Sequence, residues 1–303
     1  MRYKSTRNSQ LRLEASQVIA QGISEEGGLF VPETLPDLRE ELPALAKLEY
    51  PALAKTIFRK FLTGFAPEEV GYCVDSAYMA DKFDGASPVK LVPLLEHDED
   101  KYLLELWHGP TCAFKDMALQ ILPYFLTTSL KKSGGGKEAV ILTATSGDTG
   151  KAALEGFKDV PGTRILVFYP RDGVSPTQKK QMVTQEGGNV CVCAIEGNFD
   201  DAQASVKRIF TDPALKEALA AHGLLFSSAN SINWGRLLPQ IVYYVYAYLE
   251  LARTGRLSLG DPMDVVVPTG NFGNILAAYY AQKMGIPIRK LVCASNRNKV
   301  LTD

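Results

Sequence analysis

From about Glu138 onward, short runs of apolar, β-branched residues alternate with longer helical patterns. This order is typical of parallel sheets with helices on their faces, because parallel strands need a crossover segment between them. The predicted strands are AVILTAT (139–145), TRILVFY (163–169), NVCVCAI (189–195), LLFSSA (224–229), DVVVP (264–268) and IRKLVCA (288–294). The sequence therefore predicts an α/β protein built on parallel sheets.

Length and charge narrow the class of protein. At 303 residues the chain is long enough for two domains and a large buried core. Its 33 basic residues nearly cancel its 34 acidic ones, so the overall charge gives no reason to expect nucleic acid or an anionic membrane as a partner. Apolar runs stay short of the ~20 residues that cross a bilayer, and the N-terminus lacks a secretory signal. We therefore expect a cytoplasmic protein that binds neither.

Cysteine and histidine give no sign of a metal site. The five cysteines form no CxxC pair, and the three histidines stand far apart in the sequence. Cys191 and Cys193 lie two apart in a predicted strand, so they share one face of a sheet, and we expect both thiols to be buried as small apolar groups. No bound metal is expected.

Helices can be placed by their end signals and their composition. Ser175 is predicted as an N-cap, with Gly187 just past the end of that helix. A long helix from about Arg236 to Arg253, rich in Leu, Ile, Val and Tyr, is predicted to be buried on most faces. Another helix is predicted over residues 117–130, after a strand at 101–107. Residues 1–85 show short helices and proline-punctuated connections with few strands, which favours a separate N-terminal domain.

Two loops follow predicted strands and open helices, where N–H groups point at the crevice beyond the sheet. SGDTG (146–150) offers two glycines and two hydroxyl groups to a carboxylate or phosphate, although a capped tight turn explains it equally well. TGNFGN (269–274) offers backbone N–H groups and Asn amides to an anion such as a cofactor phosphate. Since this loop is not GxGxxG, a dinucleotide is disfavoured.

A third loop, NSINWGR (230–236), also precedes a helix. Its Ser231, Asn233 and Arg236 could hold a phosphate through paired hydrogen bonds, and the alternative is an N-capped helix with a solvated arginine. SGGGK (133–137) precedes its strand and lacks the rest of the Walker pattern, so it is interpreted as a flexible connection.

Lys115 stands where a strand gives way to a helix, in LWHGPTCAFKD (106–116). Between Phe114 and an apolar helix its amine would be partly desolvated, which lowers the pKa of an ammonium group and favours a nucleophile. By itself such a lysine is also expected at a surface or at a helix cap. Together with three anion-binding loops at one sheet edge, it favours an imine with pyridoxal 5′-phosphate, whose phosphate the backbone N–H groups would hold.

Five motifs in fixed order resemble the threonine synthase family, pyridoxal-phosphate enzymes of fold type II related to tryptophan synthase β. They are HGPTCAFKD, ATSGDTGKAALEGF, EGNFDDAQ, NSINWGR and VPTGNFGN, and YKSTRN…GGLFVPE (3–33) resembles the family's N-terminal domain. The resemblance implies an N-terminal domain over 1–85, a large domain of 86–127 and 226–303, and a small α/β domain over 128–225. Family members continue beyond SNRNKVLTD, which implies that the C-terminal part of the large domain is missing.

The resemblance also implies a role for each matching residue. Lys115 matches the lysine that binds the cofactor covalently and then moves protons. The positions that match the cofactor-phosphate loop are Gly270, Asn271, Phe272, Gly273 and Asn274. The positions that match the site of the substrate α-carboxylate are Ser146, Gly147, Asp148 and Thr149, and those expected at the substrate phosphate are Asn230, Ser231, Asn233 and Arg236.

The reaction that the resemblance implies converts O-phospho-L-homoserine and water to L-threonine and phosphate, by γ-elimination and β-addition. Two alternatives stay open: a threonine-synthase-like phospholyase that releases 2-oxobutyrate, and an inactive truncated product. The residue contacting the pyridine nitrogen is not identified, and the chain is expected to be a monomer or a homodimer.

Overall fold

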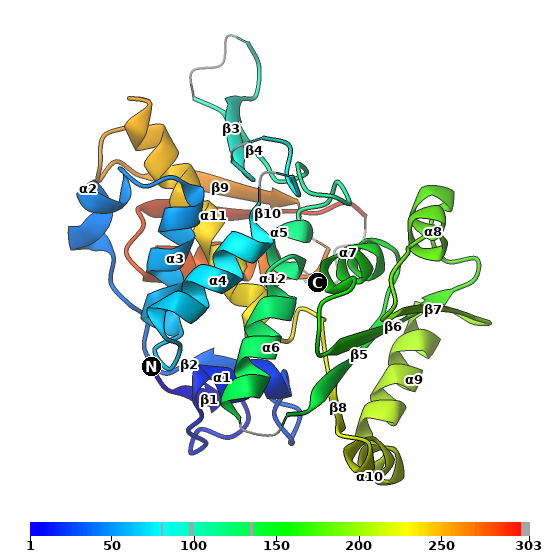
Figure 1. Cartoon of the computed structure of the whole chain (residues 1–303). Helices are drawn as coiled ribbons and strands as arrows, with labels where there is room; N and C mark the ends of the chain where they lie inside the picture. The colour runs from blue at the N-terminus through cyan, green and yellow to red at the C-terminus, as the bar shows by residue number, and fades with distance from the viewer. Residues whose placement is uncertain (80, 86, 97–99, 134–135, 269, 298–303) are drawn as a thin grey trace.

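The computed structural model describes residues 1–79, 81–85, 87–96, 100–133, 136–268 and 270–297. Thr269 of the TGNFGN loop, two glycines of the SGGGK connection and the last residues of SNRNKVLTD lie outside these ranges. The elements, coloured along the chain in Figure 1, are β1 (Tyr3–Ser5), α1 (Ala15–Gln21), β2 (Phe30–Pro32), η1 (Arg39–Glu41), α2 (Leu42–Leu45), α3 (Tyr50–Phe61), α4 (Pro67–Ala77), β3 (Lys90–Pro93), β4 (Tyr102–Glu105), α5 (Asp116–Leu119), α6 (Leu122–Lys132), β5 (Glu138–Ala144), α7 (Asp148–Phe157), β6 (Thr163–Pro170), α8 (Pro176–Val183), β7 (Val190–Ile195), α9 (Phe199–Thr211), α10 (Pro213–Ala221), β8 (Leu224–Ser227), α11 (Trp234–Arg253), β9 (Met263–Pro268), α12 (Gly273–Lys283) and β10 (Ile288–Ala294).

The predicted strands form two parallel sheets. Four of them make a sheet of order β7-β6-β5-β8, in which every neighbouring pair is parallel. The other two, β9 and β10, pair in parallel as a separate sheet. Two antiparallel pairs, β1–β2 and β3–β4, complete the strands of the described chain. The α/β prediction is confirmed. The sequence had suggested that the loops after β5 and β9 share one sheet edge, but these strands belong to different sheets.

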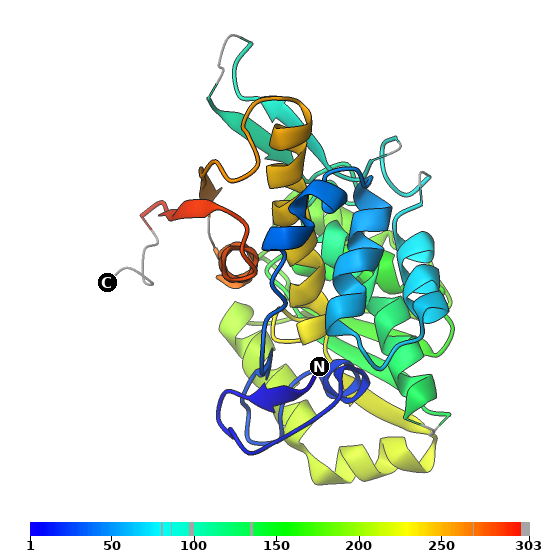
Figure 2. The same ribbon diagram turned by 90° about the vertical axis from the view of Figure 1, so that its left-hand side faces the viewer.

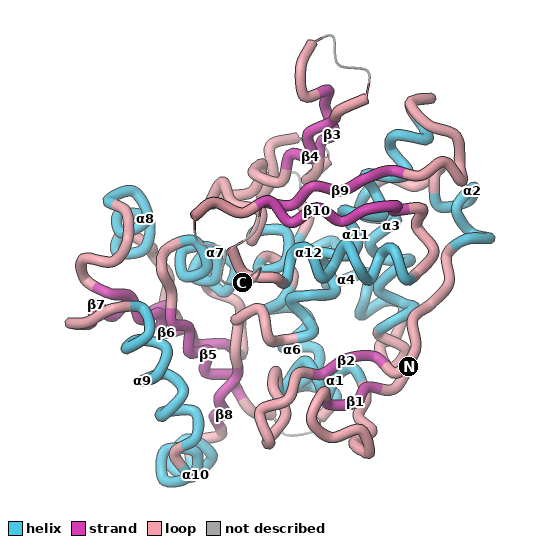
Figure 3. Tube along the Cα trace, turned by 180° about the vertical axis from the view of Figure 1, so that it is seen from behind, coloured by secondary structure: helices cyan, strands magenta, loops and turns pink. Residues whose placement is uncertain are grey.

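Helices cover both faces of the four-stranded sheet because the side chains of a strand alternate between its faces. On β5, Val140, Leu142 and Ala144 cluster with Ala202 and Val206 of α9. The alternate residues of that strand, Ala139 and Ile141, belong to the main hydrophobic cluster. Helix α7 packs on β5 and β6, and Figure 3 shows α7 and α9 on either side of these strands.

Helix α11 is central to the packing, since it contacts α1, α3, α5, α6 and α12. It is buried on nearly every face, as predicted, and it tolerates Pro239 in its second turn. Helix α12 packs on α11 and on the β9–β10 pair, and Figure 2 shows it between them. The same hydrophobic cluster takes in side chains of α1, α3 and α4 from the N-terminal region. The proposed domain division at residues 85, 127 and 225 stays a prediction.

Two predictions about helices are wrong. Residues 117–130 form two helices, α5 and α6, because Pro123 lacks an N–H group and its ring would clash with the carbonyl of Leu119 in a continuous helix. The helix that begins after Ser175 has the predicted cap but ends at Val183, and Gly187 has a φ of 147°, which is not a left-handed helical cap.

The thiols of the predicted buried pair are accessible. Cys191 is exposed and Cys193 is half-buried, with their sulfur atoms 3.9 Å apart on the same face, as alternation requires. The sequence did not reveal that β7 is an edge strand of its sheet.

Two glycines provide a test of how tightly the helices pack. A Cβ on Gly156 of α7 would lie 2.1 Å from the carbonyl oxygen of Leu119, whereas a Cβ on Gly71 of α4 would meet nothing within 4 Å. Gly156→Ala should lower the free energy of unfolding by about 2–3 kcal/mol through overpacking. Gly71→Ala should raise it by ~0.5–1 kcal/mol, since alanine is the better helix former. Urea unfolding followed by circular dichroism measures both, and equal effects would contradict the close contact of α5 with α7.

Candidate active site

The turn before Lys115 is held by a buried carboxylate. One oxygen of Asp116 accepts a hydrogen bond from the backbone N–H of Thr111 at 2.8 Å, and the other accepts one from the Thr111 hydroxyl at 2.7 Å. Gly109 packs so closely against Asp116 that a Cβ would lie 2.6 Å from the Asp116 Cβ. Burial raises the pKa of the Asp116 carboxyl, and the hydrogen bonds from Thr111 oppose this shift. The turn therefore fixes the backbone that carries Lys115.

Lys115 itself is largely enclosed. Its side chain is 16% exposed, its Nζ lies 4.6 Å from the centre of the Phe114 ring, and it approaches Asp148 Oδ2 at 3.5 Å. Burial lowers the pKa of the Lys115 ammonium, while Asp148 opposes this shift and the nearby cations Arg236 and Lys151 add to it. The desolvated amine predicted from the sequence is present.

The SGDTG loop reaches Lys115 through Asp148. Gly147 has a φ of 137°, and a Cβ there would lie 2.3 Å from Gln178 Oε1, so both the backbone and the space call for glycine. Thr145 Oγ1 accepts hydrogen bonds from the N–H groups of Gly147 and Gly150. Within the described part of the chain, the N–H groups at the first two positions of α7, Asp148 and Thr149, make no hydrogen bond, as expected for a helix N-terminus that can receive an anion.

A cavity of about 100 Å³ opens beside Lys115. Phe114 and Lys115 form one wall, and the start of α11 with the residues before it contributes Ser231, Arg236 and Gln240. The remaining wall comes from the end of β9 and the loop after it, through Pro268, Gly270, Asn271, Gly273 and Asn274. Residues from three distant parts of the sequence therefore meet around one lysine.

Arg236 is a buried cation without a counter-ion. It is only 3% exposed, its Nη1 donates to the carbonyl of Ala229 at 2.8 Å, and its Nε has no partner. No carboxylate lies within ion-pair distance of it among the described residues. Burial lowers the pKa of this guanidinium to about 10, so it stays charged at neutral pH. The solvated arginine considered from the sequence is thus wrong.

Two tyrosines of α11 orient the loop after β9. Tyr243 and Tyr244 donate hydrogen bonds to Asn274 Oδ1 at 2.7 and 2.5 Å. Burial raises the pKa of both phenols, which keeps them protonated as donors. This pair fixes the Asn274 amide at the cavity wall.

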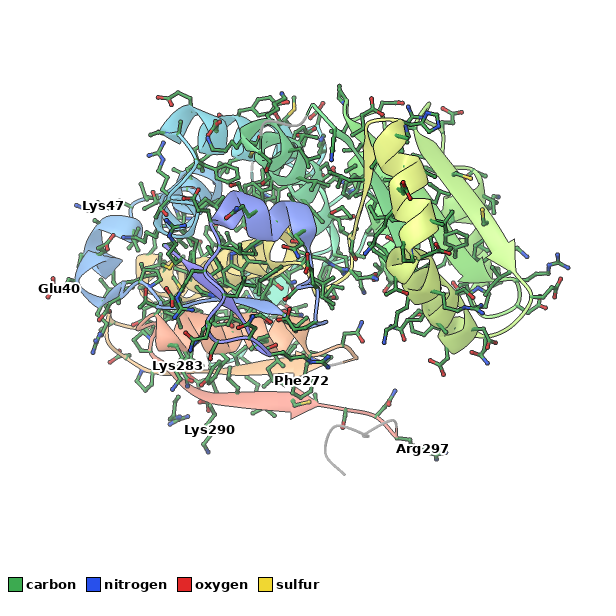
Figure 4. All side chains as sticks on the ribbon, turned by 90° about the horizontal axis from the view of Figure 1, so that it is seen from below. Glu40, Lys47, Phe272, Lys283, Lys290 and Arg297 are labelled. Carbon is green, nitrogen blue, oxygen red and sulfur yellow. The ribbon has the colours of Figure 1, made fainter. Side chains whose placement is uncertain are left out.

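Not all of the predicted site residues reach the cavity. Among the described residues its wall lacks Ser146, Gly147, Asp148, Thr149, Asn230 and Asn233. Asn233 caps α11 by accepting from the N–H of Gly235, and its amide donates to the carbonyls of Ile19 and Ser228, so the capping alternative holds for this residue. Phe272 is outside the wall too, 44% exposed at the start of α12, where Figure 4 labels it.

Several residues at or near the cavity were not identified from the sequence. Gln240 lines the cavity one turn after Arg236, and Gln178 donates to Asp148 Oδ1 at 2.8 Å from α8, which is remote in sequence. Lys151, three residues after Asp148, lies 3.5 Å from the same oxygen. Its i,i+3 spacing in the SGDTGK run was a visible signal. His108, which precedes the turn, contacts Glu105 Oε2 through its Nε2 at 2.7 Å.

Comparison with known proteins decides the family. A model described as "Pyridoxal-phosphate dependent enzyme" matches residues 82–302. The chain belongs to this family. A second model, "Threonine synthase N terminus", matches residues 2–78. The resemblance, the fold type II assignment and the cofactor, pyridoxal 5′-phosphate, are therefore confirmed.

The relatives extend beyond this chain. Threonine synthase of Pseudomonas aeruginosa is 40% identical, and the match covers 99% of this chain and 61% of that protein. Human threonine synthase-like 1 is 41% identical, and the match covers 95% of this chain and 39% of that protein. A crystal structure of pyridoxal-phosphate-bound threonine synthase from Brucella melitensis superposes with a TM-score of 0.87 at 38% identity, covering 98% of this chain and 61% of that one. The chain thus spans between two fifths and three fifths of these proteins.

The residues present fit the cofactor of the family. Lys115 supplies a desolvated amine, and a Cβ on Gly270 would meet nothing within 4 Å, so a ligand can approach the backbone there.

The turn of Lys115 makes a testable prediction about stability. Asp116→Ala removes both hydrogen bonds and leaves a buried N–H without a partner, so we expect a loss of about 3 kcal/mol in the free energy of unfolding. Thr111→Val removes only the hydroxyl bond and should cost about 1–2 kcal/mol. Urea unfolding of the two variants is the measurement. A smaller loss for Asp116→Ala than for Thr111→Val would show that the carboxylate does not organise the turn.

Proposed function

We propose that this chain performs the threonine synthase reaction, in which O-phospho-L-homoserine and water give L-threonine and phosphate. The observation that carries the proposal is the buried Arg236 guanidinium, which faces the same cavity as Lys115 and has no carboxylate partner in the described ranges. The likeness to proteins named threonine synthase, at 40% identity, supports it.

Each charged group of the substrate has a counterpart. Arg236 and Ser231 would bind the substrate phosphate, since a guanidinium pairs with phosphate oxygens through two parallel hydrogen bonds. The N–H groups at the start of α7, on Asp148 and Thr149, would receive the α-carboxylate. The loop Gly270–Asn274 would bind the cofactor phosphate, with Asn274 held by its two tyrosines.

The bound cofactor supplies an electron sink for the negative charge that develops at the substrate's carbon atoms. Lys115, whose amine is uncharged more readily than that of an exposed lysine, would take the proton from Cα and return protons later. A second proton would leave Cβ, and its C–H electron pair would form the Cβ–Cγ double bond as the Cγ–O bond breaks and phosphate leaves with the Cγ–O electron pair. The hydroxyl of water would then add at Cβ, and protons would return to Cγ and Cα. Arg236 would hold the leaving phosphate, because its charge is not neutralised by a protein carboxylate.

The role of Lys115 can be tested without turnover. The protein is incubated with pyridoxal phosphate, reduced with borohydride and mapped by mass spectrometry for a pyridoxyl adduct. We expect the adduct on Lys115 and its absence in Lys115→Ala. Lys283→Ala is a matched control, because Lys283 also lies over an aromatic ring, 5.2 Å from the centre of Tyr279, but is exposed at the far end of α12 (Figure 4). An adduct that persists in Lys115→Ala would remove this lysine from the proposal.

The products decide between the open alternatives. Incubation with O-phospho-L-homoserine and pyridoxal phosphate should yield threonine and phosphate in equal amounts. Phosphate with 2-oxobutyrate would replace the proposal with the phospholyase reaction. An adduct on Lys115 without any phosphate release would mean that this chain binds the cofactor but does not complete the reaction.

Arg236 provides a second test of the substrate. Arg236→Lys keeps a cation but loses the planar pair of donors, so kcat/KM for the phosphorylated substrate should fall roughly 10- to 100-fold. The pyridoxyl adduct on Lys115 should still form, because Arg236 is assigned to the substrate. Unchanged kcat/KM would contradict a phosphate contact at this residue.

A further inference from the structure

The Asp148 carboxylate lies between the partly buried Lys115 and the buried Lys151. Its Oδ2 approaches Lys115 Nζ at 3.5 Å, and its Oδ1 approaches Lys151 Nζ at 3.5 Å while accepting a hydrogen bond from Gln178 at 2.8 Å. The carboxylate is 45% exposed, whereas Lys151 as a whole residue is 8% exposed. Lys151 is therefore a charged group held inside the protein with no other carboxylate within ion-pair distance among the described residues.

Lys151 also touches the turn that carries Lys115. Its Nζ donates a hydrogen bond to the carbonyl of Thr111 at 3.0 Å. Thr111 is the residue whose N–H and hydroxyl bind the Asp116 carboxylate. The Lys151 ammonium thus connects helix α7, which follows β5, with the turn that carries Lys115.

We propose that Lys151 is a positioning residue, which ties the SGDTG loop to the turn of Lys115 and divides the Asp148 carboxylate between two lysines. The inference rests on the proposed role of Lys115 as the amine that binds the cofactor. If Asp148 paired with Lys115 alone, that ion pair would strengthen and the ammonium form would dominate. Because only the free amine attacks an aldehyde, Lys151 keeps Lys115 reactive near neutral pH.

The charges around Lys115 are few. Helix α7 contributes Asp148 and Lys151, and helix α11 contributes Arg236. The loop Gly270–Asn274 has no ionisable side chain, and the Asp116 carboxylate is bound to Thr111. Arg236 and Lys151 both disfavour the ammonium form of Lys115, and Asp148 favours it, so each removal has a definite sign.

The test is the pH at which Lys115 becomes half-reactive in the cofactor-free full chain. Trace acetylation over a pH series, with an added model amine as standard and peptide mapping, gives this midpoint for Lys115. Lys151→Met should raise the midpoint by roughly one pH unit, which leaves about a tenth of the free amine at neutral pH. Asp148→Asn should lower the midpoint, because the ammonium form loses its anion. Lys151→Arg should stay near the wild-type value.

Lys158→Met is the matched control, because Lys158 lies at the far end of the same helix, about 15 Å from Asp148 at 1.5 Å per residue. In the Lys158→Met variant the midpoint of Lys115 should equal the wild-type value. An unchanged midpoint in Lys151→Met, or a shift of the same size in Lys158→Met, would overturn the proposal.

A double-mutant cycle separates division of the carboxylate from simple loosening of the site. In the Asp148→Asn background, Lys151→Met should shift the midpoint by less than it does in wild type, since no carboxylate remains to be released. An equal shift in both backgrounds would mean that Lys151 acts on Lys115 only by direct charge repulsion, and the proposed division of the Asp148 carboxylate would be wrong.

The pyridoxyl adduct is measured separately on the same proteins. Midpoints that shift as expected without any adduct would support the role of Lys151 and refute the proposed function. An adduct on Lys115 with unmoved midpoints would support Lys115 as the cofactor-binding lysine and refute the role of Lys151.

Discussion

The site depends on an excess of buried and partly buried positive charge. Lys115, Lys151 and Arg236 point to the same region, and Asp148 is the one carboxylate within ion-pair distance of any of them in the described chain. Burying an unpaired cation is costly, so such an arrangement survives only where the surrounding structure fixes it. Its consequence is a cavity wall that favours anions and an amine that gives up its proton more readily than an exposed lysine.

Rigid neighbours hold these charges in place. The Lys115 turn is organised by Asp116 and Thr111, and the Asn274 amide by two tyrosines of α11. Arg236 lies in the first turn of that same helix, whose N-cap Asn233 is also bonded to the carbonyl of Ile19 in α1. The N-terminal region, the central helix and the cavity are therefore parts of one packed structure, and the geometry of the site follows from the core.

Two of the predictions that failed share a physical origin. The burial of Cys191 and Cys193 depends on whether another strand pairs beyond β7, which a local pattern does not contain. The role of Asn233 depends on which carbonyls come within reach of its amide, and two of the groups it binds are far apart in the chain. The helix break before Pro123, in contrast, followed from steric rules that the sequence already displayed.

The sequence by itself determined the strands of the two parallel sheets, the long buried helix, the loops that open helices, and Lys115 as a partly desolvated amine. These features follow from local periodicity, capping residues and motif order, which act over a few residues. Tertiary structure alone decided that the anion loops belong to two sheets, that Arg236 is buried without a counter-ion, and that Lys151 and Gln178 share Asp148 with Lys115. The reason is physical: the charge state of a side chain depends on neighbours through space, and those neighbours come from helices and loops that only folding brings together.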